Sequence, residues 1–248
     1  HLIDGWQSNF TREAYEKAIA RTVDYILAGD IFQANITQMF EAAIPKGFDP
    51  FAFYRELRQK NPATFAAFLD YGEVQIASSS PERLLRHDGT SVEARPIKGT
   101  RRRDKDPSRD ASLIADLTSS RKDRAENVMI VDLLRNDLSR VSKPGTVKVP
   151  VLCGLETYAN VHHLVSVITS ELKDGHGLGE LIGATFPGGS ITGAPKIRAM
   201  EIIAELEPTA RGPYCGAIGY LGFDGSLDSN IVIRTYCIKG EDISFQVG

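Results

Sequence analysis

Lys98 lies in the segment PIKGT, where an amine between apolar residues and a glycine could act as a nucleophile. An amine nucleophile must be unprotonated, and the apolar Pro96 and Ile97, together with the cations of Arg101–Arg103, would favour the neutral form. Gly99 would let another backbone or a ligand approach closely. The alternative is a solvated lysine, which is the commoner situation. The segment therefore indicates either a reactive amine or an exposed basic patch.

Carboxylates in two further segments could also do chemistry. Glu82 lies in SSSPERLL, in a tight Ser-Pro turn at the end of an expected strand, and could be a general acid if it were buried. Asp123 and Glu126 lie one turn apart on an expected helix, where two carboxylates facing the same way would suit Mg²⁺. In both cases the alternative is a solvent-exposed acid, which is common on helix faces and in loops.

The segment FPGGSITGAPKIRAM (186–200) places glycines and hydroxyl groups directly before a helix expected near Pro195. Free N–H groups at a helix N-terminus favour an anion, although the spacing is not that of a P-loop and a generic cap is the alternative.

In NVHHLVS, neighbouring strand residues face opposite ways, so at most one of His162 and His163 can enter a given site. Because no His or Cys lies at zinc spacing, a zinc site is not expected.

Periodicity and turn residues predict the elements that must position these side chains. Helices are expected from the N-cap Thr11 to Gly29, from Asp49-Pro50 to about 60, over about 108–140, and from Pro195 to Leu206. Strands are expected over 31–40, in hairpins turning at Tyr71-Gly72 and Asp88-Gly89, and over 146–152, 157–171, 214–223, 229–238 and 242–247. Groups of strands joined by hairpin turns alternate with helices, which predicts an α+β protein with antiparallel sheets.

The strand expected over 31–40 alternates in polarity. Its apolar face would carry Phe32, Ala34 and Ile36, and its polar face Gln33, Asn35 and Thr37. Three uncharged hydrogen-bonding side chains on one face suit a polar site, and a solvated sheet face is the alternative.

Composition excludes several classes of protein. The net charge of −3 is not the positive charge expected of a protein that binds nucleic acid or an anionic membrane. No apolar run approaches the length of a membrane span. The three cysteines have no pairing or metal spacing and indicate reduced thiols in a cytoplasmic protein. No linker or repeat interrupts residues 1–248, which predicts one domain. The sequence opens without methionine and stops in a strand-like segment, so we expect truncation at both ends.

Six segments together resemble the chorismate-utilising enzymes, a family that includes anthranilate, isochorismate, salicylate and aminodeoxychorismate synthases. They are SSSPERLL, PIKGT, DRAENVMIVDLLRNDLSRV, VHHLVS, FPGGSITGAPKIRAMEII and CGAIGYLGF, in the family's order and spacing over essentially the whole chain. The resemblance implies a four-layer α/β/β/α fold in which two large antiparallel sheets are flanked by helices. It also implies that chorismate, a dicarboxylate, is the substrate.

The resemblance assigns a role to each matching residue. Lys98 matches a nucleophile and Glu82 the general acid that protonates the C4 hydroxyl. Glu126 matches a ligand of the cofactor Mg²⁺, whose second glutamate ligand in the family would lie beyond Gly248. The residues matching substrate-binding positions are Tyr214 and Arg234, which would hold the enolpyruvyl carboxylate, and His163 and Ser190, which would lie near the ring and its leaving hydroxyl.

Two positions discriminate among family members. Isochorismate and salicylate synthases carry a lysine base at the position of Gln33, and glutamine cannot activate water in this way. Anthranilate synthases have alanine at the position of Lys98, whereas lysine there is similar to component I of the aminodeoxychorismate synthases. The resemblance thus implies covalent amination of chorismate to 4-amino-4-deoxychorismate on the route to para-aminobenzoate and folate. A glutamine amidotransferase subunit would supply ammonia, and a separate lyase would release pyruvate.

Two alternatives and one uncertain site accompany this interpretation. The first alternative is an anthranilate synthase component I that carries lysine at 98. The second is a non-catalytic module that binds a phosphorylated ligand or nucleic acid through residues 193–196 and Arg101–Arg103. The segment NPATFAAF loosely resembles part of the family's tryptophan pocket, so a tryptophan site near Thr64, Phe65 and Ala66 is a further expectation.

Overall fold

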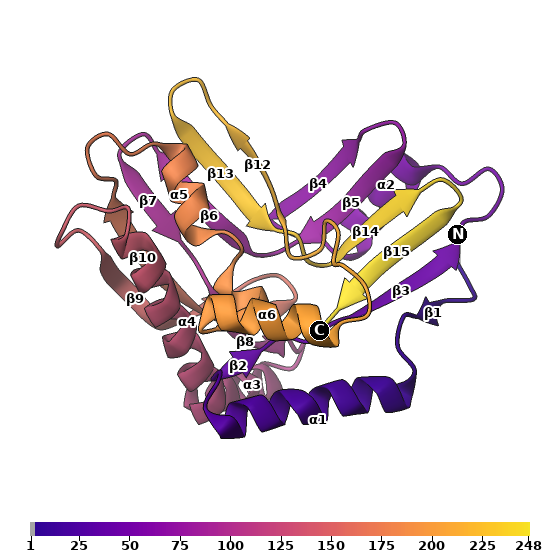
Figure 1. The fold of residues 1–248 in the computed structure, drawn as a ribbon, viewed down its shortest axis with the longest axis horizontal. Helices are drawn as coiled ribbons and strands as arrows, with labels where there is room; N and C mark the ends of the chain where they lie inside the picture. The colour runs from indigo at the N-terminus through magenta and orange to yellow at the C-terminus, as the bar shows by residue number, and fades with distance from the viewer. Residues whose placement is uncertain (1–2) are drawn as a thin grey trace. The chain divides into compact units, whose positions relative to one another are not determined.

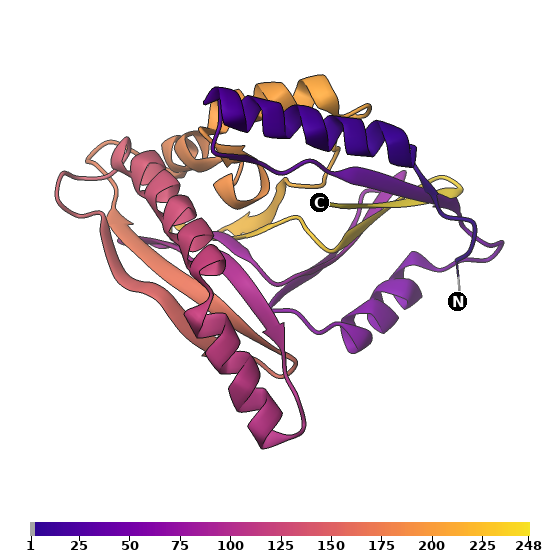
Figure 2. The same cartoon turned by 90° about the horizontal axis from the view of Figure 1, so that it is seen from below.

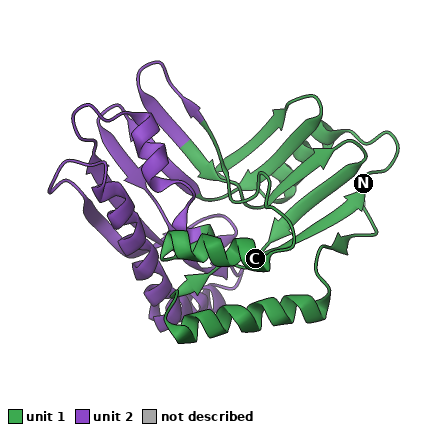
Figure 3. Cartoon of the chain, viewed as in Figure 1, with its two compact units in different colours: residues 1–82, 191–219, 229–248 green, residues 83–190, 220–228 purple. Residues whose placement is uncertain are grey.

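The structure is a computed structural model that describes residues 3–248. Within that range the chain divides into two compact units, coloured separately in Figure 3. Unit 1 contains residues 3–82, 191–219 and 229–248, and unit 2 contains residues 83–190 and 220–228. Each unit therefore combines segments that are far apart in the sequence.

Unit 1 is built on an antiparallel sheet of six strands within the described residues, in the order β1-β3-β15-β14-β5-β4 (Figure 1). The strands are β1 (Gln7–Ser8), β3 (Gln38–Ala43), β4 (Phe65–Asp70), β5 (Val74–Ser80), β14 (Thr235–Lys239) and β15 (Asp242–Val247). Phe40 of β3 pairs with Phe245 of β15, so early and late parts of the sequence meet in one sheet. The predicted hairpin at Tyr71-Gly72 is confirmed, because β4 and β5 pair across it and Gly72 has a φ of 80°.

The helices of unit 1 are α1 (Arg12–Ala28), α2 (Pro50–Lys60) and α6 (Lys196–Leu206). The predicted N-cap Thr11 accepts a hydrogen bond from the Ala14 N–H at 3.2 Å, and α1 ends at Gly29, which has the left-handed φ of 84°. Figures 1 and 2 show α1 and α6 side by side, and Ala18 and Ile203 share one apolar cluster between them. A short sheet of β2 (Gln33–Ala34) and β11 (Gly193–Ala194) precedes α6.

Unit 2 is built on a sheet with the order β12-β13-β6-β7-β10-β8, with β9 also paired to β10. The strands are β6 (Arg83–Asp88), β7 (Ser91–Ala94), β8 (Ile97–Arg102), β9 (Lys148–Thr157), β10 (Val161–Glu171), β12 (Ala217–Leu221) and β13 (Ser226–Ile231). Residues 217–219 of β12 and 229–231 of β13 belong to unit 1. The helices are α3 (Pro107–Ser119), α4 (Arg121–Ser139) and α5 (Leu178–Thr185), followed by the 3₁₀ turn η1 (Gly189–Ile191). Helix α4 packs on β8 and β10. The α+β class with two large antiparallel sheets is confirmed.

The single helix expected over 108–140 is two helices. Ser120 has a ψ of 107°, which interrupts the helix between α3 and α4. Its backbone N–H donates to the Leu117 carbonyl, while its Oγ accepts from the Asp123 N–H at 3.2 Å. One serine therefore ends the first helix and caps the second, as serine readily does.

Two strand predictions were too long. The segment 31–40 is broken into β2 and β3, which pair with different strands: β2 pairs with β11, and β3 pairs with β1 and β15. Phe32 is 76% exposed. The strand expected over 229–238 is interrupted at Arg234, whose φ of 51° is left-handed. Among the described residues no helix is long and apolar enough to cross a membrane.

Candidate functional site

Lys98 and Ser190, two predicted site residues, are in direct contact in unit 2. Lys98 lies half-buried on β8, and its Nζ donates to the Ser190 carbonyl oxygen at 3.2 Å. The Ser190 Oγ is buried and has no hydrogen-bond partner among residues 3–248. A buried hydroxyl without a partner is costly and is the kind of group a ligand satisfies. The contact therefore places the predicted nucleophile beside a hydroxyl that is available to a bound molecule.

Gly99 serves close packing next to Lys98. It has a φ of 86°, and a Cβ added there would lie 2.9 Å from the Asp123 Cβ and 3.0 Å from Leu117 Cδ1. The expected close approach is confirmed, and the neighbours are helices α3 and α4. Glycine is thus required both by the backbone conformation and by the space between β8 and these helices.

Gly99→Ala should therefore destabilise unit 2 and displace Lys98. Gly145 is a matched control, because its φ of 79° is similar but a Cβ there would meet nothing within 4 Å. Both variants carry backbone strain, and the clash should cost Gly99→Ala about 1–3 kcal/mol more. Urea denaturation of both variants measures this difference, and equal unfolding free energies would contradict the packing role.

Two of the three arginines after Lys98 are ion-paired, so they do not form a free basic stripe. Arg101 pairs with Asp116 at 2.5 Å and with Asp123 at 3.3 Å, and Arg103 pairs with Asp110 at 3.1 Å. Carboxylates therefore neutralise both of these guanidinium groups. The same pairing weakens the alternative of a phosphate-binding patch.

Asp123 and Glu126 do not act as a carboxylate pair. Asp123 is committed to Arg101, whereas Glu126 has 34% of its side chain exposed and contacts only the Lys122 ammonium, at 3.8 Å. Within residues 3–248 the structure has no cluster of three or more His, Cys, Asp or Glu side chains that could hold a metal ion. Mg²⁺ commonly uses one or two carboxylates with water and substrate oxygens, so the loosely held carboxylate of Glu126 fits such an ion. The Mg²⁺ site therefore remains a prediction.

The two histidines on β10 bond to separate groups, as their alternation predicts. The His163 Nδ1 is 2.8 Å from Thr100 Oγ1 on β8, the strand that carries Lys98. The His162 ring is fully buried, with Nδ1 2.9 Å from Thr157 Oγ1 and Nε2 2.9 Å from Asp110 Oδ1. Hydrogen bonds to the Asp104 N–H and to His162 hold the pKa of Asp110 well below its usual range. His162 is thus a core residue whose hydrogen bonds are satisfied. His163 is the member of the pair that contacts β8, the strand that carries Lys98.

Glu82 in unit 1 has the burial that its predicted role requires. It is 7% exposed and lies between β5 and β6, directly before Arg83. Its carbonyl accepts from the Ile231 N–H at 3.0 Å, and the Ser80 Oγ donates to the Ile231 carbonyl at 2.6 Å. These two hydrogen bonds tie the main chain at Glu82 to Ile231.

Tyr214 and Arg234, predicted to bind a carboxylate, also belong to unit 1. Burial raises the pKa of the Tyr214 hydroxyl well above its ordinary value, so this group is a donor at neutral pH. Arg234 is exposed, its carbonyl accepts from the Ser79 N–H, and no ion pair engages its guanidinium within residues 3–248. A neutral phenol and an uncommitted guanidinium are suitable donors for a carboxylate.

Gln33 lies half-buried on β2, opposite Ala194 of β11. The other residues of the expected polar face have structural partners, since Asn35 Nδ2 donates to the Ile191 carbonyl and Thr37 Oγ1 donates to Glu207. A Cβ at Gly193 would collide with the Gln33 carbonyl, so this glycine permits β2 to pack against β11. That packing explains the glycine without an anion at the start of α6.

The residues suggested for tryptophan lie at the start of β4. Phe65 pairs with Ser80 across the β4–β5 ladder, and its carbonyl accepts from Asn230 Nδ2 at 2.9 Å. Thr64 is exposed and Ala66 is half-buried. Binding of tryptophan here stays a prediction.

Three polar groups that hold site segments were missed by the sequence interpretation. Asp110 fixes His162, and a buried ion pair joins Arg211 to Glu207 at 2.7 Å. The four-residue spacing of Glu207 and Arg211 was no signal for this ion pair, because both residues lie beyond the end of α6 at Leu206. Nothing local marked Asp110, which lies 52 residues from its histidine.

Comparison with known proteins agrees with the resemblance. The sequence profile of the chorismate binding enzymes matches residues 2–248. Aminodeoxychorismate synthase component 1 of Escherichia coli (strain K12) is 49% identical over 234 residues, covering 94% of this chain and 51% of that protein. Anthranilate synthase component 1 of Thermus thermophilus is 46% identical over 243 residues, covering 98% of this chain and 52% of that protein. The crystal structure of anthranilate synthase component I from Streptococcus pneumoniae superposes with a TM-score of 0.91 at 37% identity, covering 100% of this chain and 54% of that one.

The chain spans about half the length of the curated relatives it matches. Two kinds of synthase are similarly close to it, so similarity alone does not select one activity. The profile match over nearly all of its length and the shared fold place the chain in the chorismate binding enzyme family.

Proposed function

We propose that this chain carries the chorismate-binding part of an aminodeoxychorismate synthase component 1. The observation that carries the proposal is the hydrogen bond from Lys98 Nζ to the Ser190 carbonyl, which aims an amine at the segment bearing an unsatisfied hydroxyl. Relatives with that name are 44–49% identical to this chain. Gln33 cannot act as a base toward water, so amination is favoured over water addition.

The reaction balances as chorismate plus ammonia giving 4-amino-4-deoxychorismate and water. Lys98 Nζ bonds to C2 of the ring as the C4–O bond breaks and both ring double bonds shift. Glu82 gives its proton to the departing hydroxyl, which leaves as water. Ammonia then bonds to C4, the C2–N bond breaks, and a proton from the new ammonium group returns to Glu82. Both steps, the addition of Lys98 at C2 and the addition of ammonia at C4, thus avoid a free ring cation.

The other predicted residues would bind and orient the substrate. Tyr214 and Arg234 would donate to the enolpyruvyl carboxylate, while His163 and Ser190 would contact the ring and its hydroxyl. Glu126 would hold Mg²⁺, which would supply positive charge to the ring carboxylate. A glutamine amidotransferase subunit would supply the ammonia, as the "component 1" of the relatives' names suggests.

The product distinguishes this proposal from its nearest alternative. The protein at its full natural length is incubated with chorismate, Mg²⁺ and ammonium, and products are separated by chromatography and identified by mass. We expect 4-amino-4-deoxychorismate, which yields para-aminobenzoate only after an added lyase acts. Fluorescent anthranilate formed without a lyase would instead identify an anthranilate synthase.

A further inference from the structure

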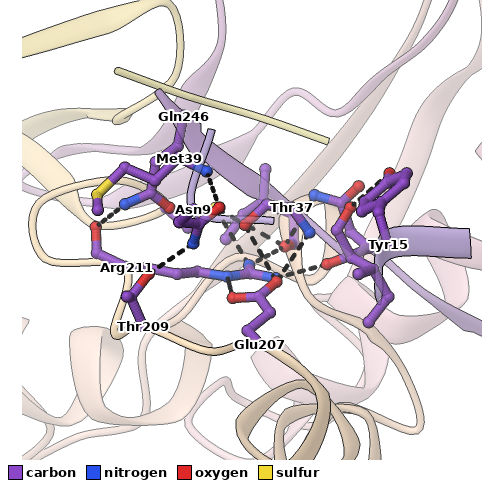
Figure 4. Close-up of polar contacts among 12 residues, drawn as sticks. Asn9, Tyr15, Thr37, Met39, Glu207, Thr209, Arg211 and Gln246 are labelled. Carbon is purple, nitrogen blue, oxygen red and sulfur yellow. Dashed lines mark hydrogen bonds and ion pairs between the residues drawn. The ribbon is translucent and has the colours of Figure 1, made fainter. Parts of the chain in front are cut away.

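Arg211 lies at the centre of a polar network in unit 1 that the proposed reaction does not use (Figure 4). Its guanidinium binds Glu207 through two bonds, Nη2–Oε1 at 2.7 Å and Nε–Oε2 at 3.0 Å. Only 13% of the Arg211 side chain and 5% of the Glu207 side chain are exposed. A buried pair of this kind contributes little net stability over an apolar pair, but it specifies geometry through its bidentate fork.

The remaining donors of Arg211 reach two backbone carbonyls on distant segments. Nη1 donates to the Ile191 carbonyl at 2.8 Å, and Nη2 also donates to the Asn35 carbonyl. Asn35 directly follows β2, which carries Gln33, and Ile191 directly follows Ser190. One guanidinium therefore holds the ends of two segments whose neighbouring residues are assigned to the substrate.

Arg211 and Glu207 also hold the loop that carries Tyr214. The Arg211 carbonyl accepts from the Tyr214 N–H at 3.2 Å and from Gln246 Nε2 at 2.8 Å. Nη1 of Arg211 donates to Cys215 Sγ at 3.3 Å, and burial raises the pKa of this thiol to about 11, so it is protonated at neutral pH.

Glu207 extends the network toward β3. Its Oε1 accepts from both the N–H and the hydroxyl of Thr37, at 2.8 and 3.0 Å. The segment between β2 and β3, which lacks a sheet partner of its own, is thereby fixed by the same carboxylate that binds Arg211. Because every donor and acceptor of the pair is engaged, a shift in one segment would strain the others.

We infer that the Arg211–Glu207 pair is a positioning device that sets the segments of unit 1 carrying Gln33 and Tyr214 in their substrate-binding arrangement. This inference rests on the proposed function. The pair itself does not touch substrate. Its loss should weaken substrate binding equally in the ground state and the transition state, which raises KM and leaves kcat nearly unchanged.

Arg211→Lys tests the inference in the protein at its full natural length. Lysine keeps the charge but cannot contact Glu207 bidentately while also reaching both carbonyls. We expect a cooperative fold by circular dichroism, a KM for chorismate raised at least about tenfold, and kcat within about threefold of wild type. Arg198→Lys is the matched control, because Arg198 is likewise held by carboxylates, those of Asp30 and Glu201, but 39% of its side chain is exposed on α6. Its KM should equal that of wild type.

Chemical rescue separates positioning from mere stability. Guanidinium at non-denaturing concentration should restore the KM of Arg211→Ala in a saturable manner, and equal methylammonium should not. Should Arg211→Ala fail to fold, Glu207→Gln provides the same KM test while leaving the arginine in place. A wild-type KM in Arg211→Lys, or loss of kcat in proportion to unfolded protein with KM unchanged, would overturn the inference.

Amide hydrogen exchange without substrate keeps this inference separate from the proposed function. Arg211→Lys should accelerate exchange in peptides containing Thr37 and Cys215, and Arg198→Lys should not. If the wild type neither binds nor converts chorismate, the proposed function fails while the exchange result still reports on the pair. If the wild type converts chorismate and exchange at Thr37 and Cys215 is unchanged in Arg211→Lys, the positioning role is refuted.

Discussion

Lys98→Ala should abolish a covalent adduct that forms when the protein at its full natural length meets chorismate and Mg²⁺ without ammonia. In the wild type, Lys98 adds to the ring and water departs, so the peptide containing Lys98 should gain the mass of chorismate less one water. Without ammonia the second half of the exchange cannot follow, and the adduct should accumulate. Rapid acid quench followed by peptide mass spectrometry measures it.

Lys98→Arg is the matched control for this experiment. Arginine keeps a cation near the Ser190 carbonyl but is not nucleophilic, since its guanidinium remains protonated. We expect both variants to lack the adduct and to lose most turnover, with residual amination in Lys98→Ala coming from direct attack by ammonia. If Lys98→Arg turns over like wild type and no wild-type adduct is trapped, the lysine is an orienting cation and covalent catalysis is wrong.

Glu126→Gln should lower the apparent affinity of the enzyme for Mg²⁺ by at least about tenfold, because it removes the charge of a metal ligand. The fold should be unaffected, since Glu126 is partly exposed and forms a long ion pair with Lys122 at 3.8 Å. Activity should therefore fall sharply at low Mg²⁺ and recover partly at high Mg²⁺. A titration of initial rate against Mg²⁺ concentration measures the shift.

Asp132→Asn supplies the comparison for this titration. Asp132 lies on the same helix and pairs with Arg135 at 3.2 Å, but its side chain is well exposed. Removing its charge should leave the Mg²⁺ dependence unchanged. If Glu126→Gln and Asp132→Asn give the same titration curve, Glu126 is an ordinary surface acid.

Local signals in the sequence predicted the elements that local chemistry determines. Thr11 and Asp49 cap α1 and α2 with their own side chains, and the turns at Gly72 and Gly89 have the positive φ that glycine favours. Helix α5 was missed because Gly177 offers no capping side chain and the helix itself contains two glycines. The break at Ser120 was missed because a serine can lie inside a helix as well as between two.

The partners of charged residues could not be predicted, because they come from distant parts of the chain. Arg101–Arg103 looked like a basic stripe, but carboxylates of α3 and α4 neutralise Arg101 and Arg103. Arg211 was unremarkable in sequence, yet it reaches the Asn35 carbonyl 176 residues away. The contact between Lys98 and Ser190 spans 92 residues and agrees with roles that only the family resemblance had suggested. The spacing of residues within one helix or strand cannot predict contacts between distant parts of the chain.

The pairing of β3 with β15 has a consequence for biosynthesis. Within the described residues, the sheet neighbours of β3 are the two-residue β1 and the late strand β15. During translation the strands β6 to β10 leave the ribosome, and can pair with one another, well before β15 has been made. One edge of β3 therefore stays open until β15 has been made, and an open edge is a template for pairing with other chains. The nascent protein should be most prone to aggregation, and most dependent on a chaperone, in the interval before its residue 247 emerges.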